Sequence, residues 1–165
     1  MYVAYLRKKG VAIGKGTMFY GRIGIDLVEP SLLEVGENCR FTDGVQILTH
    51  GYEWVVLREK YGELHLASPE KVVIEDNVFI GKNSIILKGV RIGKNTIIGA
   101  GSVVTKDIPA GSVDAGNPCR VIMSLDEYWE KMKSECVKEA KPAPSNCISS
   151  AAGKRQRSKI PGSKP

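Results

Sequence analysis

The chain has 165 residues, of which 42% are hydrophobic and 25% charged, a composition typical of one folded domain in water. Its formal net charge of +6 comes entirely from residues 141–165, which hold six basic side chains and no acidic one. The rest of the chain is neutral overall, which excludes a folded domain that attracts nucleic acid through a general positive charge.

Sequence features argue against membrane, zinc and redox classes. No apolar run approaches the ~20 residues that span a bilayer. The first segment, MYVAYLRKKG, lacks the apolar core of a signal peptide, so we expect a cytoplasmic protein without membrane insertion. The four cysteines, at positions 39, 119, 136 and 147, form no Cys-x-x-Cys pair, so we expect free thiols and no bound metal.

Large apolar residues recur every six positions after the N-terminal segment MYVAYLRKK, which we expect to cover the first coil. The early positions are Ile13, Phe19, Ile25, Val35, Phe41 and Ile47. Residues 74–109 then divide into the hexads IEDNVF, IGKNSI, ILKGVR, IGKNTI, IGAGSV and VTKDIP. Each hexad opens with an aliphatic residue and has a small or β-branched residue at its fifth position. This spacing differs from both the helical period and simple strand alternation.

The six-residue repeat predicts an all-β solenoid. Each hexad forms a short strand and a corner, and three hexads form one triangular coil whose strands pair in parallel with the next coil, ~4.8 Å away. The positions 13, 35, 74 and 92 then share one face, as do 19, 41, 80, 98 and 25, 47, 86, 104. Insertions of four and 21 residues follow Ile25 and Ile47, so both leave the prism at the same corner.

The longer insertion contains the chemically interesting residues. His50, in QILTHGYEW, stands where the chain leaves the prism, and His65 is the only other histidine of the chain. If Ile47 stacks on Ile25, then Leu48 lies near Asp26 and His50 lies near Val28. Loops on a rigid scaffold often carry function, so His50 is a candidate catalytic residue.

A helix is predicted after the repeat, followed by a basic tail. Ser124 and Glu127 form a capping box, and apolar residues at helical spacing follow it. We expect this helix to fold back over the open end of the prism. The predicted organisation is a β-helix over residues 1–123 with a protruding loop at 51–72, a capping helix at 124–140, and a disordered basic tail at 141–165.

The hexads, together with IGAGSVVTKDIPAGSVDAGNPCRVI, resemble the hexapeptide-repeat acyltransferases, and most of all the galactoside, maltose and capsular-polysaccharide O-acetyltransferases. The resemblance covers roughly residues 11–125. It implies a left-handed parallel β-helix and a homotrimer that binds acetyl-CoA in the groove between adjacent prisms. It also implies transfer of an acetyl group to a hydroxyl of a sugar or glycan precursor.

The resemblance also implies roles for individual residues. His50 matches the family's catalytic histidine, a general base that takes the proton of the acceptor hydroxyl. The backbone amide of Lys82, in IGKN, is the implied donor to the developing oxyanion. The carboxylate that orients His50 is Asp26 by the stacking register, with Asp43 and Glu53 as alternatives.

Four further residues carry over to the donor, acetyl-CoA. Ala100 and Thr105 are expected to meet the pantetheine arm through their backbone groups. Lys106 and Arg120 are expected to face the phosphates. Read without the resemblance, Ala100 is a corner residue and the two cations are surface charges.

Three residues are candidates for the acceptor site. Tyr52 and Trp54 offer flat aromatic faces for a sugar ring, or pack to anchor the loop. His65 lies in the same loop and either lines the acceptor pocket or belongs to the surface.

Other functions remain open at this point. Acyl transfer to an amino sugar or to serine uses the same fold and is separated by comparing amine with hydroxyl acceptors. A zinc hydrolyase needs three histidine ligands, and the chain has two. A non-catalytic solenoid scaffold has no evident need for a long corner loop.

Overall fold

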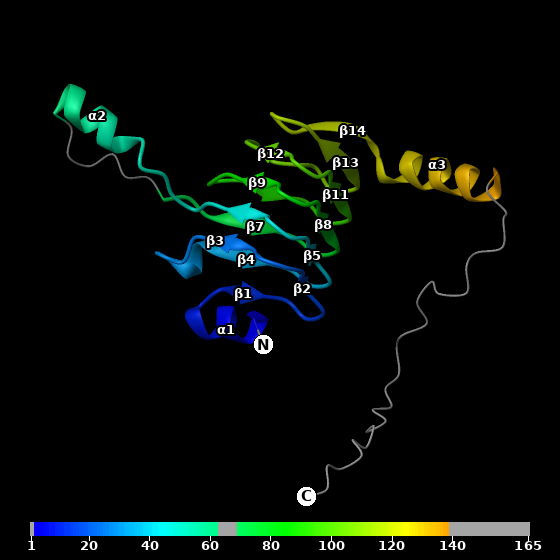
Figure 1. Cartoon of the computed structure of the whole chain (residues 1–165), viewed down its shortest axis with the longest axis horizontal. Helices are drawn as coiled ribbons and strands as arrows, with labels where there is room; N and C mark the ends of the chain where they lie inside the picture. Colours follow the sequence, from blue (N-terminus) through cyan, green and yellow to red (C-terminus); the bar gives the residue numbers. More distant parts are fainter. Residues whose placement is uncertain (1, 63–68, 139–165) are drawn as a thin grey trace, which may run out of the picture.

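The computed structural model describes residues 2–62 and 69–138, with side chains described up to residue 135. Figure 1 shows a prism of stacked coils with a helix at its N-terminal end and two helices that project to either side. His65 and the tail at 141–165 lie outside the described residues.

Twelve short strands form the four coils. The first coil contains β1 (Ala12–Ile13), β2 (Met18–Phe19) and β3 (Gly24–Ile25), and the second contains β4 (Leu33–Val35), β5 (Arg40–Phe41) and β6 (Gln46–Ile47). The third contains β7 (Val72–Ile74), β8 (Val78–Ile80) and β9 (Ile85–Ile86), and the fourth contains β10 (Arg91–Ile92), β11 (Thr96–Ile98) and β12 (Val103–Val104). They stack into three sheets, in the orders β1-β4-β7-β10, β2-β5-β8-β11 and β3-β6-β9-β12.

The predicted stacking register is confirmed on all three faces. Parallel pairs join Ile13 to Val35, Phe19 to Phe41 and Ile25 to Ile47, and the third and fourth coils continue the same ladders. From the second coil onward these side chains are buried, so they form the apolar core of the prism. Each such side chain contributes about 1.5–3 kcal/mol through removal from water.

The chain turns a corner after each strand. We call the corner after a strand of the first sheet the first corner, and we name the second and third corners in the same way. Asn38, Asn77 and Asn95 occupy the first corner with φ of 56°, 56° and 57°. Asparagine tolerates this left-handed conformation better than most residues. Their amides also form a ladder, because Asn38 donates to Asn77 at 3.3 Å and Asn77 donates to Asn95 at 2.8 Å.

Both insertions leave at the third corner, as predicted. The shorter one contains a 3₁₀ turn, η1 (Pro30–Leu32). The longer one contains α2 (Trp54–Tyr61), which the sequence did not predict and which has no buried residue. Figure 1 shows α2 far from the sheets.

The N-terminal end of the prism is covered as expected. The helix α1 (Tyr2–Lys9) buries Leu6 against the core, and its Arg7 donates to the carbonyls of Ile13 and Gly14 at 2.8 Å. The edge of the first coil is therefore shielded.

The C-terminal end differs from the prediction. After the fourth coil, β13 (Ser112–Ala115) extends the second sheet, and β14 (Arg120–Ser124) pairs with it antiparallel. The capping box is present, since the Ser124 and Glu127 side chains accept from each other's backbone amides, and it begins α3 (Leu125–Lys138).

The prediction that α3 covers the open end of the prism is wrong for the described chain. Figure 1 shows α3 pointing away from the coils, and Trp129 in its apolar stripe is 59% exposed. The stripe instead borders the outer surface of the second sheet at Ile97, because β14 leads the chain outward before the helix begins.

Candidate active site

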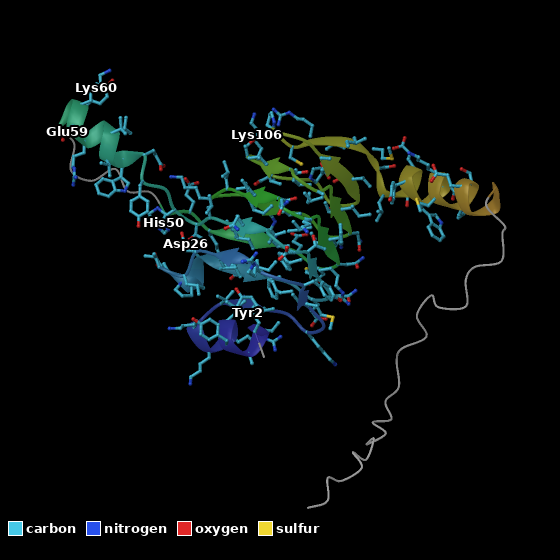
Figure 2. The ribbon with its side chains drawn as sticks, in the orientation of Figure 1. Tyr2, Asp26, His50, Glu59, Lys60 and Lys106 are labelled. Atoms are coloured by element: carbon cyan, nitrogen blue, oxygen red, sulfur yellow. The ribbon has the colours of Figure 1, made fainter. Side chains whose placement is uncertain are left out.

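His50 and Asp26 lie in contact at the third corner. Asp26 follows β3, His50 follows β6, and the Asp26 amide donates to the carbonyl of Ile47 at 3.1 Å. This bond stacks the two corners, and His50 Nδ1 meets Asp26 Oδ2 (Figure 2). The side chains are 21% and 10% exposed, so the pair is largely buried but still reaches solvent.

The contact determines which nitrogen of His50 can accept a proton. A carboxylate only accepts hydrogen bonds, so Nδ1 is the donor and Nε2 carries the lone pair in the neutral imidazole. A histidine held in this way by a carboxylate can take a proton from a hydroxyl that reaches Nε2.

Two further donors fix the Asp26 carboxylate. The Thr49 hydroxyl donates to Oδ2 at 3.1 Å, and the Val28 amide donates to Oδ1 at 3.2 Å. The sequence reasoning gave no role to Thr49. The available signal was its place directly before His50, two residues after the end of β6.

The two alternative carboxylates have other partners. Asp43 lies at the second corner, where it accepts from the Arg22 amide at 2.7 Å, and this hydrogen bond lowers the pKa of its carboxyl. Glu53 accepts from Lys88 at 2.6 Å, and this hydrogen bond lowers the pKa of the Glu53 carboxyl. Asp26 is therefore the carboxylate that the fold places against His50.

A cavity of about 260 Å³ opens beside His50. Its lining residues come from both insertions at the third corner: Val28, Glu29, Leu32, His50, Gly51, Tyr52, Trp54 and Pro69. The Tyr52 ring stands edge-on to the imidazole with 5.3 Å between ring centroids, and Trp54 begins α2. The structure thus places Tyr52 and Trp54 at a cavity that includes the candidate base.

The remaining candidate residues lie elsewhere on the prism. Lys82 and Ala100 occupy the second corner on consecutive coils, and the Gly101 amide donates to the Lys82 carbonyl at 2.7 Å. Thr105 and Lys106 occupy the third corner two coils beyond His50, and Figure 2 shows Lys106 at the C-terminal end of the prism. Arg120 lies on β14 and donates to the Cys119 carbonyl.

One side of the triangle separates Lys82 from His50 within the chain. Lys82 follows β8 at the second corner and His50 follows β6 at the third corner, so the strands of the third sheet lie between the two corners. A single copy therefore does not bring the Lys82 amide to the imidazole.

Within residues 2–62 and 69–138, no three His, Cys, Asp or Glu side chains gather closely enough to hold a metal ion. None of the helices in these ranges is long and apolar enough to cross a bilayer.

Comparisons with known proteins point to one family. The model of the bacterial transferase hexapeptide family, described as six repeats, matches residues 71–106. Protein CapG of Staphylococcus aureus is 42% identical over 132 residues, which cover 77% of this chain and 73% of CapG.

Solved structures agree with this result. A maltose O-acetyltransferase from Clostridium difficile superposes with a TM-score of 0.57 at 35% identity, covering 74% of this chain and 73% of its own. A galactoside acetyltransferase in complex with coenzyme A gives a TM-score of 0.59 at 28% identity, covering 78% and 72%. These neighbours belong to the left-handed β-helix family.

Proposed function

Because the chain belongs to the hexapeptide-repeat transferases, we propose that it is an acetyl-CoA-dependent O-acetyltransferase that acts on a hydroxyl of a sugar or glycan precursor. Within the family, acetyltransferase activity is the shared chemistry of the similar proteins. The observation that supports this proposal most directly is the His50–Asp26 contact beside a cavity.

The proposed reaction is direct transfer with His50 as the general base. Nε2 takes the proton of the acceptor hydroxyl while the oxygen attacks the thioester carbonyl carbon. The tetrahedral intermediate collapses, the C–S bond breaks, and the thiolate leaves with the proton from the imidazolium. Asp26 stays ionised throughout and stabilises the positive charge on His50. The Lys82 amide is the proposed donor to the oxyanion.

The separation of Lys82 from His50 supports a homotrimer. If the second corner of one copy meets the third corner of the next, the Lys82 amide and the imidazole face the same groove. Three copies related by a threefold axis repeat this contact and close the ring. In this arrangement Ala100 and Thr105 line the donor groove, and Lys106 and Arg120 lie near its C-terminal end. We propose the left-handed β-helix over residues 1–123 as the catalytic domain.

The cavity supports a sugar as acceptor. The Tyr52 and Trp54 rings offer flat apolar faces, and a pyranose presents an apolar face with hydroxyls at its rim. Among the described residues that line this cavity there is a carboxylate, Glu29, and no lysine or arginine, which favours an acceptor without a negative charge. We therefore propose an uncharged sugar ring and, since the donor is an intracellular metabolite, a cytoplasmic reaction.

Two measurements test the proposal. Calorimetric titration of acetyl-CoA is expected to show one saturable site per chain that is lost in Lys106→Ala/Arg120→Ala. The matched control, Lys15→Ala/Lys131→Ala, removes two cations elsewhere on the surface and is expected to bind normally. Screening hydroxyl against amine acceptors for release of free coenzyme A then identifies the group that is acetylated. A folded protein that fails to bind acetyl-CoA at millimolar concentration would overturn the proposal.

A further inference from the structure

We propose that Thr49 is a positioning residue that holds the Asp26 carboxylate in the orientation that keeps the proton of neutral His50 on Nδ1. This inference rests on the proposed function, in which His50 must present an unprotonated Nε2. It assigns to Thr49 a role that acts through Asp26 and does not require contact with either substrate.

The Thr49 side chain is fully buried at the third corner, just after β6. Its exposed fraction is 0%, and its hydroxyl donates to Asp26 Oδ2 at 3.1 Å. The same oxygen accepts from His50 Nδ1, so the hydroxyl and the imidazole both donate to one carboxylate oxygen. A buried hydroxyl directed at a charged group forms one of the stronger hydrogen bonds in a protein.

The backbone of Thr49 is fixed from two directions. The adjacent Leu48 amide donates to the Ile86 carbonyl at 2.9 Å, which holds the strand to the next coil. The Thr49 carbonyl accepts from the Glu70 amide at 2.8 Å, which joins the start of the long loop to its end. The hydroxyl is therefore a fixed point from which the carboxylate is oriented.

The orientation of Asp26 matters because the carboxylate has one free torsion at its end. The Val28 amide holds Oδ1 and the Thr49 hydroxyl holds Oδ2, so together they define the plane of the carboxylate. Without the hydroxyl, one anchor remains besides His50 itself. Rotation of the carboxylate then weakens the contact to Nδ1, and more of the neutral imidazole carries its proton on Nε2, where it cannot act as a base.

Matched variants separate the hydroxyl from the shape of the side chain. Thr49→Val removes the hydroxyl and keeps the branched shape, whereas Thr49→Ser keeps the hydroxyl and removes the methyl group. Thr49→Ala removes the hydroxyl without adding a second methyl group and serves if Thr49→Val does not fold. Circular dichroism and thermal melting establish the fold of each variant before any other measurement.

The primary readout is the tautomer of His50, which needs no substrate. Long-range ¹H–¹⁵N spectra of the imidazole, assigned with His50→Gln, are expected to show the Nδ1–H form in the wild type and in Thr49→Ser. Thr49→Val is expected to show a mixture of both neutral forms. An unchanged Nδ1–H population in folded Thr49→Val or Thr49→Ala would overturn the proposal.

Kinetics supply the second readout. With an acceptor identified, Thr49→Val is expected to lower kcat about 10-fold and Thr49→Ser less than about 3-fold, both with an unchanged KM for acetyl-CoA. An equal loss in Thr49→Ser would point to packing and contradict the role of the hydroxyl. Failure of the proposed function would appear as an active His50→Ala enzyme, while the tautomer measurement would still decide the role of Thr49.

Discussion

Ile25 and Ile47 are register partners in the third sheet, and their pairing brings Asp26 next to His50. Neither aliphatic residue belongs to the site, yet a shift of one residue between them would separate the carboxylate from the imidazole. The contact between His50 and Asp26 therefore depends on the packing of the core ladder.

Loss of the base is expected to abolish most of the activity without loss of stability. His50→Ala should lower kcat by about 10² to 10⁴, the usual contribution of a general base. Asp26→Asn should give a smaller loss, because the imidazole remains while its orienting charge is gone. Steady-state rates with saturating acetyl-CoA measure the effect, and thermal melting of both variants serves as the control. An His50→Ala enzyme within tenfold of wild type would contradict the assignment.

Substitution of Tyr52 is expected to weaken binding of the acceptor more than binding of the donor. Tyr52 is 68% exposed at the cavity, and its ring forms a T-shaped contact with the imidazole. Tyr52→Leu removes the flat aromatic face, so KM for the acceptor should rise about 5- to 50-fold while KM for acetyl-CoA stays unchanged. Tyr61→Leu, at the far end of α2, is the matched control. Equal effects of the two changes would show that the loop and not the ring is responsible.

The asparagine ladder is expected to contribute to stability in two separable ways. Asn77→Ala places a Cβ in the left-handed region and removes two side-chain hydrogen bonds, at a combined cost of about 2–4 kcal/mol. Asn77→Gly relieves the backbone and still lacks the hydrogen bonds, so its cost should be about half as large. Urea unfolding of the two variants measures the difference. Equal destabilisation would show that the backbone conformation contributes nothing.

Asp114 is expected to make the stability of the protein depend on pH. Its carboxyl is fully buried at the last inward position of the second sheet, and Oδ1 has no hydrogen-bond partner among the described residues. Burial raises the pKa of the Asp114 carboxyl, while the hydrogen bond from Ser112 lowers it by less. The folded state thus holds this proton more tightly than the unfolded state.

The sign of the effect follows from that difference. The contribution of Asp114 to stability is fully present below the ordinary carboxyl pKa of about 4 and is lost as pH rises through the raised value. Asp114→Val removes the titration and fits the aliphatic ladder, and Ser112 keeps its hydrogen bond to the Pro109 carbonyl. The variant should gain about 1–3 kcal/mol over wild type at pH 8 and less at pH 4. A constant difference across this range would contradict the prediction.

The fold could be predicted from the sequence to the level of individual neighbours because one spacing controls it. Once Ile47 is placed on Ile25, each later hexad has a single position, and the pairing of Ile47 with Ile86 follows. Asp26 could be named for the same reason. Thr49 could not, because a β-branched residue shortly after a strand is equally typical of simple packing.

The positions of the helices were harder to predict, because the spacing of apolar residues in a helix does not indicate which surface the helix packs against. The stripe of α3 indicates an apolar face, and the sequence does not say whether that face meets the prism end or the outer surface at Ile97. The helix α2 has no buried residue, so its sequence lacks the periodic apolar positions from which a helix can be predicted. In both cases the missing information lies in tertiary contacts.

The hydrogen bond from the Glu70 amide to the Thr49 carbonyl has a consequence for how such enzymes diversify. It brings the two ends of the long insertion together. The coils beneath it are therefore connected as they would be by a tight turn, whatever the length of the insertion. We therefore expect that the segment after His50 can be exchanged, lengthened or shortened as one unit while the coils keep their register. Grafting the corresponding loop of a related transferase between Gly51 and Glu70, with His50 kept in place, tests whether this segment selects the acceptor.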